Sequence, residues 1–130
     1  MTFFDRLKTV ILNARTHVNS NRGRLKDAQT LKPEILTREK IRLDRELSDE
    51  KRRAAAALHY WTETHLTGNP EKDRETMKAS EQAHNLLTDL DRLTDEELTR
   101  SLESIREEHP GTAEHPAAPE KKTILITDFF

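Results

Sequence analysis

Apolar residues recur every three or four positions along most of the chain, the spacing that places them on one face of an α-helix. In the first such segment they fall within an arc of about 120° on a helical wheel. The apolar face consists of Phe3, Phe4, Leu7, Val10, Ile11, Ala14 and Val18. The opposite face is polar and carries Arg6, Lys8 and Arg15. We predict an amphipathic helix over residues 1–20, followed by a connection around Gly23.

A second, longer helix is predicted from Pro33 to Gly68. Proline suits the first turn of a helix, where its missing N–H costs no hydrogen bond, and glycine commonly ends one. Its apolar stripe has spacings of three, four and seven, close to a coiled-coil seam. The stripe consists of Leu36, Leu43, Leu47, Ala54, Leu58, Trp61 and His65. We expect another helix to cover it, and predict self-association through Leu43, Leu47, Ala54, Leu58 and Trp61.

Two further helices complete the pattern. The third begins near Pro70, and its apolar stripe runs from Ala79 to Leu93. Residues 94–97 (TDEE) match a capping box, which predicts a fourth helix carrying Leu98, Leu102 and Ile105. Because the turn at residues 68–70 is short, the second and third helices should be antiparallel. The predicted fold class is all-α, an antiparallel helical hairpin or small helical bundle over residues 33–108 with an amphipathic N-terminal helix.

The last twenty-two residues have a different pattern. Three prolines within residues 109–120 predict a flexible linker. The segment 121–130 (KKTILITDFF) contains β-branched residues that favour a strand in an otherwise helical sequence. One interpretation is an apolar plug that folds back onto the helices. The other is a docking peptide that extends the sheet of a partner protein. The side chains expected to make this contact are Ile124, Leu125, Ile126, Phe129 and Phe130.

Composition narrows the functional classes. The chain has no cysteine, which excludes disulfides and thiolate chemistry. It is 35% charged and 33% hydrophobic, and no apolar run approaches the roughly 20 residues of a membrane-spanning helix. The N-terminus lacks the apolar core of a secretory signal. We therefore expect a cytoplasmic protein, with peripheral contact at a membrane as an option.

The net charge of −2 hides a gradient. Residues 1–32 contain seven Lys/Arg against two Asp, a net of +5, whereas residues 71–120 contain fourteen Asp/Glu against six Lys/Arg, a net of −8. A basic head and an acidic body suggest an anionic partner or head-to-body pairing between copies. Basic runs in the long helix are interleaved with acids, so a connected stripe for phosphate binding is missing and nucleic acid is not the expected partner.

Few residues offer chemistry. Glu81 and His84 match one Glu-x-x-His element of di-iron bundles, but such a site needs a second element and more carboxylates. His59 and Glu63 are spaced as an ordinary surface pair on a helix. His65 lies on the apolar stripe near Trp61, at the edge of the predicted core. We predict no catalytic residue, no metal and no cofactor, and we expect a protein that is not an enzyme.

The start of the chain, residues 3–11 (FFDRLKTVI), resembles the N-terminal amphipathic helix of the phage-shock-protein-A family, the bacterial ESCRT-III-like membrane-remodelling proteins. Pro33-Glu34 stands where that family enters a long helical hairpin, although Thr2 replaces the family's usual glycine. The resemblance implies that the apolar face of the first helix inserts into a membrane while Arg6, Lys8 and Arg15 meet lipid headgroups.

Two functions follow from these observations. The first is a non-enzymatic helical adaptor or regulator that binds a protein partner through residues 121–130. The alternative is a self-assembling, membrane-surface protein that acts through the first helix. The two differ in the role of the Phe3–Ile11 face, which either packs into the bundle or contacts lipid.

Overall fold

The computed structural model of the chain describes residues 1–114, which form four α-helices and two short 3₁₀ helices and contain no strand. The helices are α1 (Phe3–Asp27), α2 (Pro33–Thr64), α3 (Pro70–Thr88) and α4 (Asp95–Glu108). The 3₁₀ segments are η1 (Ala28–Thr30) and η2 (Pro110–Ala113). The structure confirms the predicted all-α helical bundle.

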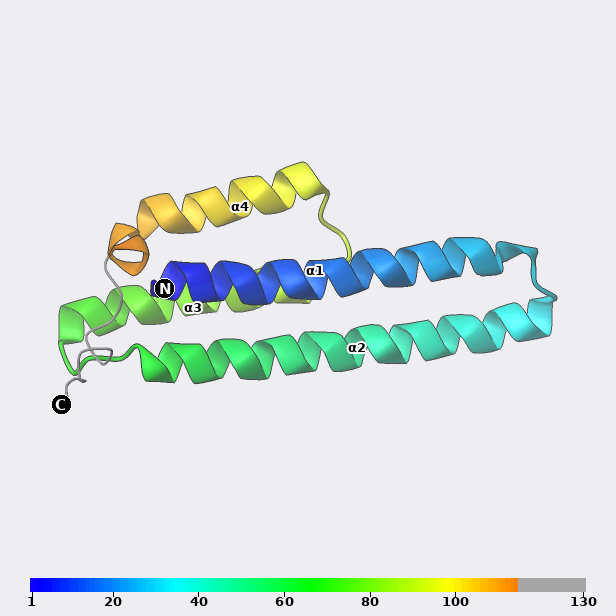
Figure 1. Ribbon diagram of the computed structural model, residues 1–130, viewed down its shortest axis with the longest axis horizontal. Coiled ribbons are helices and arrows are strands. Elements are labelled where there is room, and N and C mark those ends of the chain that lie inside the picture. The colour runs from blue at the N-terminus through cyan, green and yellow to red at the C-terminus, as the bar shows by residue number, and fades with distance from the viewer. Residues whose placement is uncertain (115–130) are drawn as a thin grey trace.

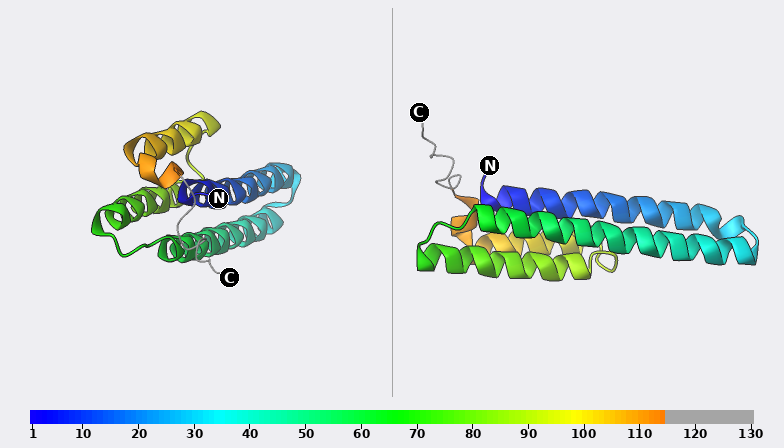
Figure 2. Two further views of the ribbon diagram at one scale, coloured as in Figure 1. Left: turned by 60° about the vertical axis from the view of Figure 1, so that its left-hand side comes forward. Right: turned by 90° about the horizontal axis from the view of Figure 1, so that it is seen from below.

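The two longest helices, α1 and α2, form an antiparallel hairpin that runs the length of the molecule (Figure 1). The shorter α3 runs antiparallel to α2, and α4 returns in the same direction as α2. Figure 2 shows that α4 lies on the side of the bundle away from α2. Because α3 and α4 are short, the distal end of the α1–α2 hairpin, at η1, extends beyond them.

The core is one continuous cluster that contains side chains from all four helices. The predicted face of α1 supplies a large share of it, since Phe3, Phe4, Leu7 and Ile11 are all buried. The other helices contribute Ala54, Leu58, Ala79, Ala83, Leu87, Leu98, Leu102 and Ile105, with Leu90 from the α3–α4 turn. The amphipathic pattern therefore reports burial inside the chain's own bundle.

The predicted end of the first helix near residue 20 is wrong, because α1 continues through Gly23 to Asp27. Glycine costs about 1 kcal/mol in a helix interior, which is the reason for expecting a break there. Contacts with α2 compensate for this cost. The Asn21 side-chain amide donates to the Leu43 carbonyl at 3.3 Å, and Arg24 pairs with Glu46 at 3.1 Å.

The predicted helix starts are confirmed by their caps. Pro33 and Pro70 occupy the first turns of α2 and α3. The Thr94 hydroxyl accepts from the Glu97 N–H at 3.1 Å, and the Glu97 carboxylate accepts from the Thr94 N–H at 2.9 Å. Helix α2 ends at Thr64, and Gly68 lies in the following turn with a φ of 88°, a conformation that favours glycine.

The predicted flexible linker is wrong for its first residues, because Pro110–Ala113 form η2, with His109 and Thr112 buried. This segment packs against α1, α3 and α4, and the Thr112 hydroxyl donates to the His109 carbonyl at 2.7 Å. Proline content predicts the absence of an α-helix but not the absence of tertiary contacts. Residues 115–120 lie outside the described part of the chain.

The continuity of α1 can be tested with Gly23→Ala. A Cβ at Gly23 would have no atom within 4 Å, so the substitution should stabilise the protein by about 0.5–1 kcal/mol. Thermal unfolding followed by circular dichroism would measure the increase. The matched control is Gly68→Ala, which should destabilise because its positive φ disfavours alanine. A lower melting temperature for Gly23→Ala would contradict the continuous helix.

Candidate functional site

An open groove of about 570 Å³ lies between α2 and α3 and is lined by polar side chains from both helices. On the α2 side it is lined by His59, Thr62, Glu63 and Leu66. On the α3 side it is lined by Arg74, Met77, Lys78, Ser80, Glu81, His84 and Asn85. A concave surface of mixed polarity is the usual starting hypothesis for a binding site.

The floor of this groove is fixed by a buried hydroxyl pair. Thr62 donates to the Leu58 carbonyl at 2.7 Å and is 2.9 Å from the Ser80 hydroxyl. The contact sets the register of the α2–α3 hairpin, because it places Thr62 opposite Ser80. His59 and His84 consequently line the same groove from opposite helices.

The groove therefore brings together the His59–Glu63 pair of α2 and the Glu81–His84 element of α3. His59 pairs with Glu63 at 3.6 Å, as their spacing predicts, and Glu81 lies exposed on α3. His84 is half-buried rather than fully solvent-facing. The hairpin prediction alone does not place these two residues together, because His59 is much nearer to the turn than His84; the register set by the Thr62–Ser80 contact does.

The groove is lined by two histidines and by charged side chains of both signs, with Glu63 and Glu81 supplying the negative charge. Burial, together with the nearby charge of His59, lowers the pKa of His84 below its ordinary value of 6.5. Arg74 and Lys78 add positive charge, while exposed Leu66 and Met77 provide apolar surface. Within residues 1–114 no group of three His, Asp or Glu side chains is arranged to hold a metal ion.

The structure places the membrane-contact candidates of α1 in the bundle. Phe3, Phe4, Leu7 and Ile11 are buried, and Val10 is half-buried. The guanidinium carbon of Arg6 lies 3.9 Å from the centre of the Trp61 ring, an attractive cation–π arrangement.

Arg15, also predicted for α1, is buried. It donates to the Leu90 carbonyl at 2.5 Å and pairs with Asp95 at 3.1 Å. Among the three basic residues predicted to meet headgroups, only Lys8 is fully exposed. Arg6 and Arg15 therefore lie on the polar face of a helical wheel, but their side chains make contacts within the bundle.

The seam predicted for self-association is also used within the chain. Leu43, Ala54 and Leu58 are buried, and Leu47 and Trp61 are partly buried. Helix α1 extends to Asp27 and lies along this stripe, so a helix of the same chain covers much of it, and self-association through the seam stays a prediction. The predicted docking residues Ile124, Leu125, Ile126, Phe129 and Phe130 lie outside the described residues.

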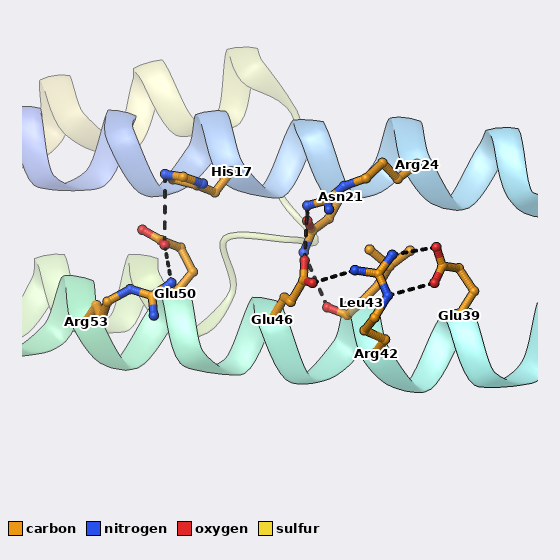
Figure 3. Close-up of polar contacts among 9 residues, drawn as sticks. All are labelled: His17, Asn21, Arg24, Glu39, Arg42, Leu43, Glu46, Glu50 and Arg53. Carbon is orange, nitrogen blue, oxygen red and sulfur yellow. Dashed lines mark hydrogen bonds and ion pairs between the residues drawn. The ribbon is translucent and has the colours of Figure 1, made fainter.

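A second polar surface lies along α1 and α2. His17 lies 3.9 Å from Glu50, which also pairs with Arg53, and Arg42 bridges Glu39 and Glu46 (Figure 3). The pairs of Arg42 and Arg53 lie within α2 at spacings of three and four, whereas His17–Glu50 and Arg24–Glu46 join the two helices and could not be found from one helix alone. This surface fixes the spacing between α1 and α2 in their distal half.

The lowered pKa of His84 leads to a prediction about pH. Because the folded state favours the neutral ring, the unfolded chain binds a proton more readily below pH 6.5. The free energy of unfolding should therefore decrease as the pH falls from 7.5 through 6.5 to 5.5. Urea unfolding should show a smaller decrease for His84→Gln. NMR titration should place the His84 midpoint below 6.5 and move it upward in His59→Gln; a midpoint at or above 6.5 would contradict the burial effect.

Comparisons with known proteins add no relative. No protein-family model, no curated protein and no solved structure matches the chain. Among the helices of residues 1–114, none combines the length and apolarity needed to span a bilayer. Function is therefore argued from the site and the sequence themselves.

Proposed function

We propose that this protein is a non-enzymatic helical adaptor or regulator that binds a protein partner through residues 121–130. The observation that carries the proposal is a mismatch between this segment and the fold. Residues 123–127 (TILIT) favour a strand, whereas residues 1–114 supply no strand to pair with it. A single strand leaves its backbone groups unpaired, so it needs the sheet edge of another protein.

The packing of the bundle supports this interpretation. The core of residues 1–114 is already filled by its own side chains, with Leu7, Ile11, Leu58 and Leu90 fully buried. A plug formed by residues 121–130 would have to cover surface outside this core. The exposed large apolar side chains near the α2–α3 turn are Tyr60, Leu66 and Met77, a smaller target than the five apolar residues of the segment.

The linker contributes to the same function. Residues 115–120 connect η2 to the docking segment and include Pro116 and Pro119. A tethered peptide gains effective concentration once another part of the molecule has engaged the same partner. The α2–α3 groove, with its mixed apolar and charged lining, offers that second contact.

The membrane-surface alternative requires α1 to leave the bundle. Phe3, Phe4, Leu7 and Ile11 would have to exchange a buried environment for lipid, and each gains about 1.5–3 kcal/mol from its present burial. Insertion would regain a similar amount but would also expose Leu58 and Ala83 to water. Protein binding is therefore the leading proposal.

The role of α1 can be tested with Phe4→Asp. Because Phe4 is buried, the substitution should lower the free energy of unfolding by at least about 3 kcal/mol, measured by urea unfolding. Lys8→Asp is the control, since Lys8 is exposed on the same helix and should change stability by about 0.5 kcal/mol or less. Unchanged stability of Phe4→Asp, combined with lost binding to anionic vesicles, would favour the membrane alternative.

Partner binding can be tested within the docking segment. Affinity purification of the full chain would identify the partner, and titration calorimetry would measure its binding. Leu125→Pro removes one backbone N–H and should weaken binding at least tenfold, because strand addition depends on backbone hydrogen bonds. The matched control Leu125→Val keeps the N–H and the strand preference and should bind normally.

Truncation after Glu120 separates docking from a plug. Docking predicts that the truncated chain keeps its melting temperature and loses the partner. A lower melting temperature with retained binding would show that residues 121–130 stabilise the bundle instead.

A further inference from the structure

Acidic and basic side chains of α2 lie on different sides of the helix. Glu46 faces α1, where it pairs with Arg24 at 3.1 Å, and Glu50 lies 3.9 Å from His17 (Figure 3). Arg45 and Arg52 lie on the opposite, exposed side of the helix. Acidic and basic residues that alternate along the sequence of α2 are therefore separated in space. This exposed side carries Arg45 and Arg52, with the half-buried Asp49 at its edge toward α1, and the three form a triplet at spacings of four and three residues.

Helix α4 carries a triplet of the opposite pattern. Leu98, Leu102 and Ile105 are buried, so the outward side of α4 presents Glu96, Arg100 and Glu103. These three exposed residues also have spacings of four and three. None of them forms an ion pair with another residue within the range 1–114.

The two triplets match residue by residue when the helices are parallel. The α2 surface reads positive, negative, positive, and the α4 surface reads negative, positive, negative. Spacings of four and three keep each set on one helical face and at one height per turn. Parallel alignment would therefore pair Arg45 with Glu96 and Arg52 with Glu103, with Asp49 and Arg100 at the edges of the contact.

The topology allows this alignment only between copies. Helices α2 and α4 run in the same direction, and they lie on opposite sides of the bundle (Figures 1 and 2). A second copy in the same orientation can therefore place its α4 against the exposed side of α2. We propose that the chain self-assembles through this contact between α2 of one copy and α4 of the next.

The contact is heterologous, because each copy uses two different surfaces. A row of any length has a free α2 surface at one end and a free α4 surface at the other, so assembly is open-ended rather than limited to a dimer. The copies are staggered along the bundle axis. The α2 triplet lies around Glu50, at the level of His17 in α1. Helix α4 begins at Asp95, at the level of Arg15, and runs away from the distal end, so the two triplets of one copy are at different heights.

The existing contacts of these residues are compatible with the assembly. Arg52 already pairs with Asp49 at 3.0 Å, and a guanidinium has enough donors to bind a second carboxylate. Ala56 follows one turn later on the exposed side and leaves room for close approach. Exposed ion pairs are individually weak and are screened by salt, so the assembly should form at high protein concentration and low ionic strength. The proposal does not depend on residues 121–130.

Sedimentation velocity of the full chain at high micromolar concentration tests the proposal. The wild type should show concentration-dependent association in 25 mM salt, and 500 mM salt should abolish it. The double variants Arg45→Glu/Arg52→Glu and Glu96→Arg/Glu103→Arg should each sediment as monomers, because each opposes like charges. Mixing the two variants should restore association, since the reversed α2 surface of one matches the reversed α4 surface of the other.

The control is Lys26→Glu/Lys32→Glu, which changes the net charge as much as Arg45→Glu/Arg52→Glu but lies outside the contact. It should still associate, and circular dichroism should show that all variants keep the wild-type melting temperature. A monomeric wild type in 25 mM salt, or a mixture that stays monomeric, would overturn the proposal. A third result would also overturn it. If Glu96→Arg/Glu103→Arg associates as the wild type does, and Arg45 and Arg52 are instead required for binding RNA, then the arginines bind a different anion.

Discussion

The bundle depends on the burial of one face of α1. Phe3, Phe4, Leu7, Ile11 and Val18 are buried against the other helices, each contributing about 1.5–3 kcal/mol. A domain of this size has a net stability of about 5–15 kcal/mol, so removing α1 would leave little to hold α2, α3 and α4 together. The length of α1 also explains why the apolar stripe of α2 is covered without a second copy.

A buried cation then fixes where α4 lies. The Arg15 guanidinium is removed from water and needs partners, which it finds in the Leu90 carbonyl at 2.5 Å and the Asp95 carboxylate at 3.1 Å. Both partners belong to the α3–α4 turn and the start of α4. Lys51 reinforces the same turn from α2, through Asp91 at 2.6 Å. These contacts hold α4 on the side of the bundle away from α2, and this separation creates two outer surfaces of different charge.

The two proposals use different parts of the molecule and support each other. Residues 121–130 are proposed to bind a partner, whereas the α2 and α4 surfaces are proposed to bind neighbouring copies. A row of copies would present many docking segments at once, and multivalent binding increases avidity without any new contact.

The sequence by itself determined the helical class, the start of each helix and the inward face of each. Local rules govern these features: Pro33 and Pro70 in first turns, the Thr94–Glu97 capping box and the periodic apolar faces. It failed at Gly23 and at residues 110–113, where contacts from other helices overrode local preference. Only the tertiary structure decided that Arg15 is buried, that His59 and His84 share a groove, and that α2 separates its charges. Each of these depends on which helix lies opposite, and a pattern along one helix does not contain that information.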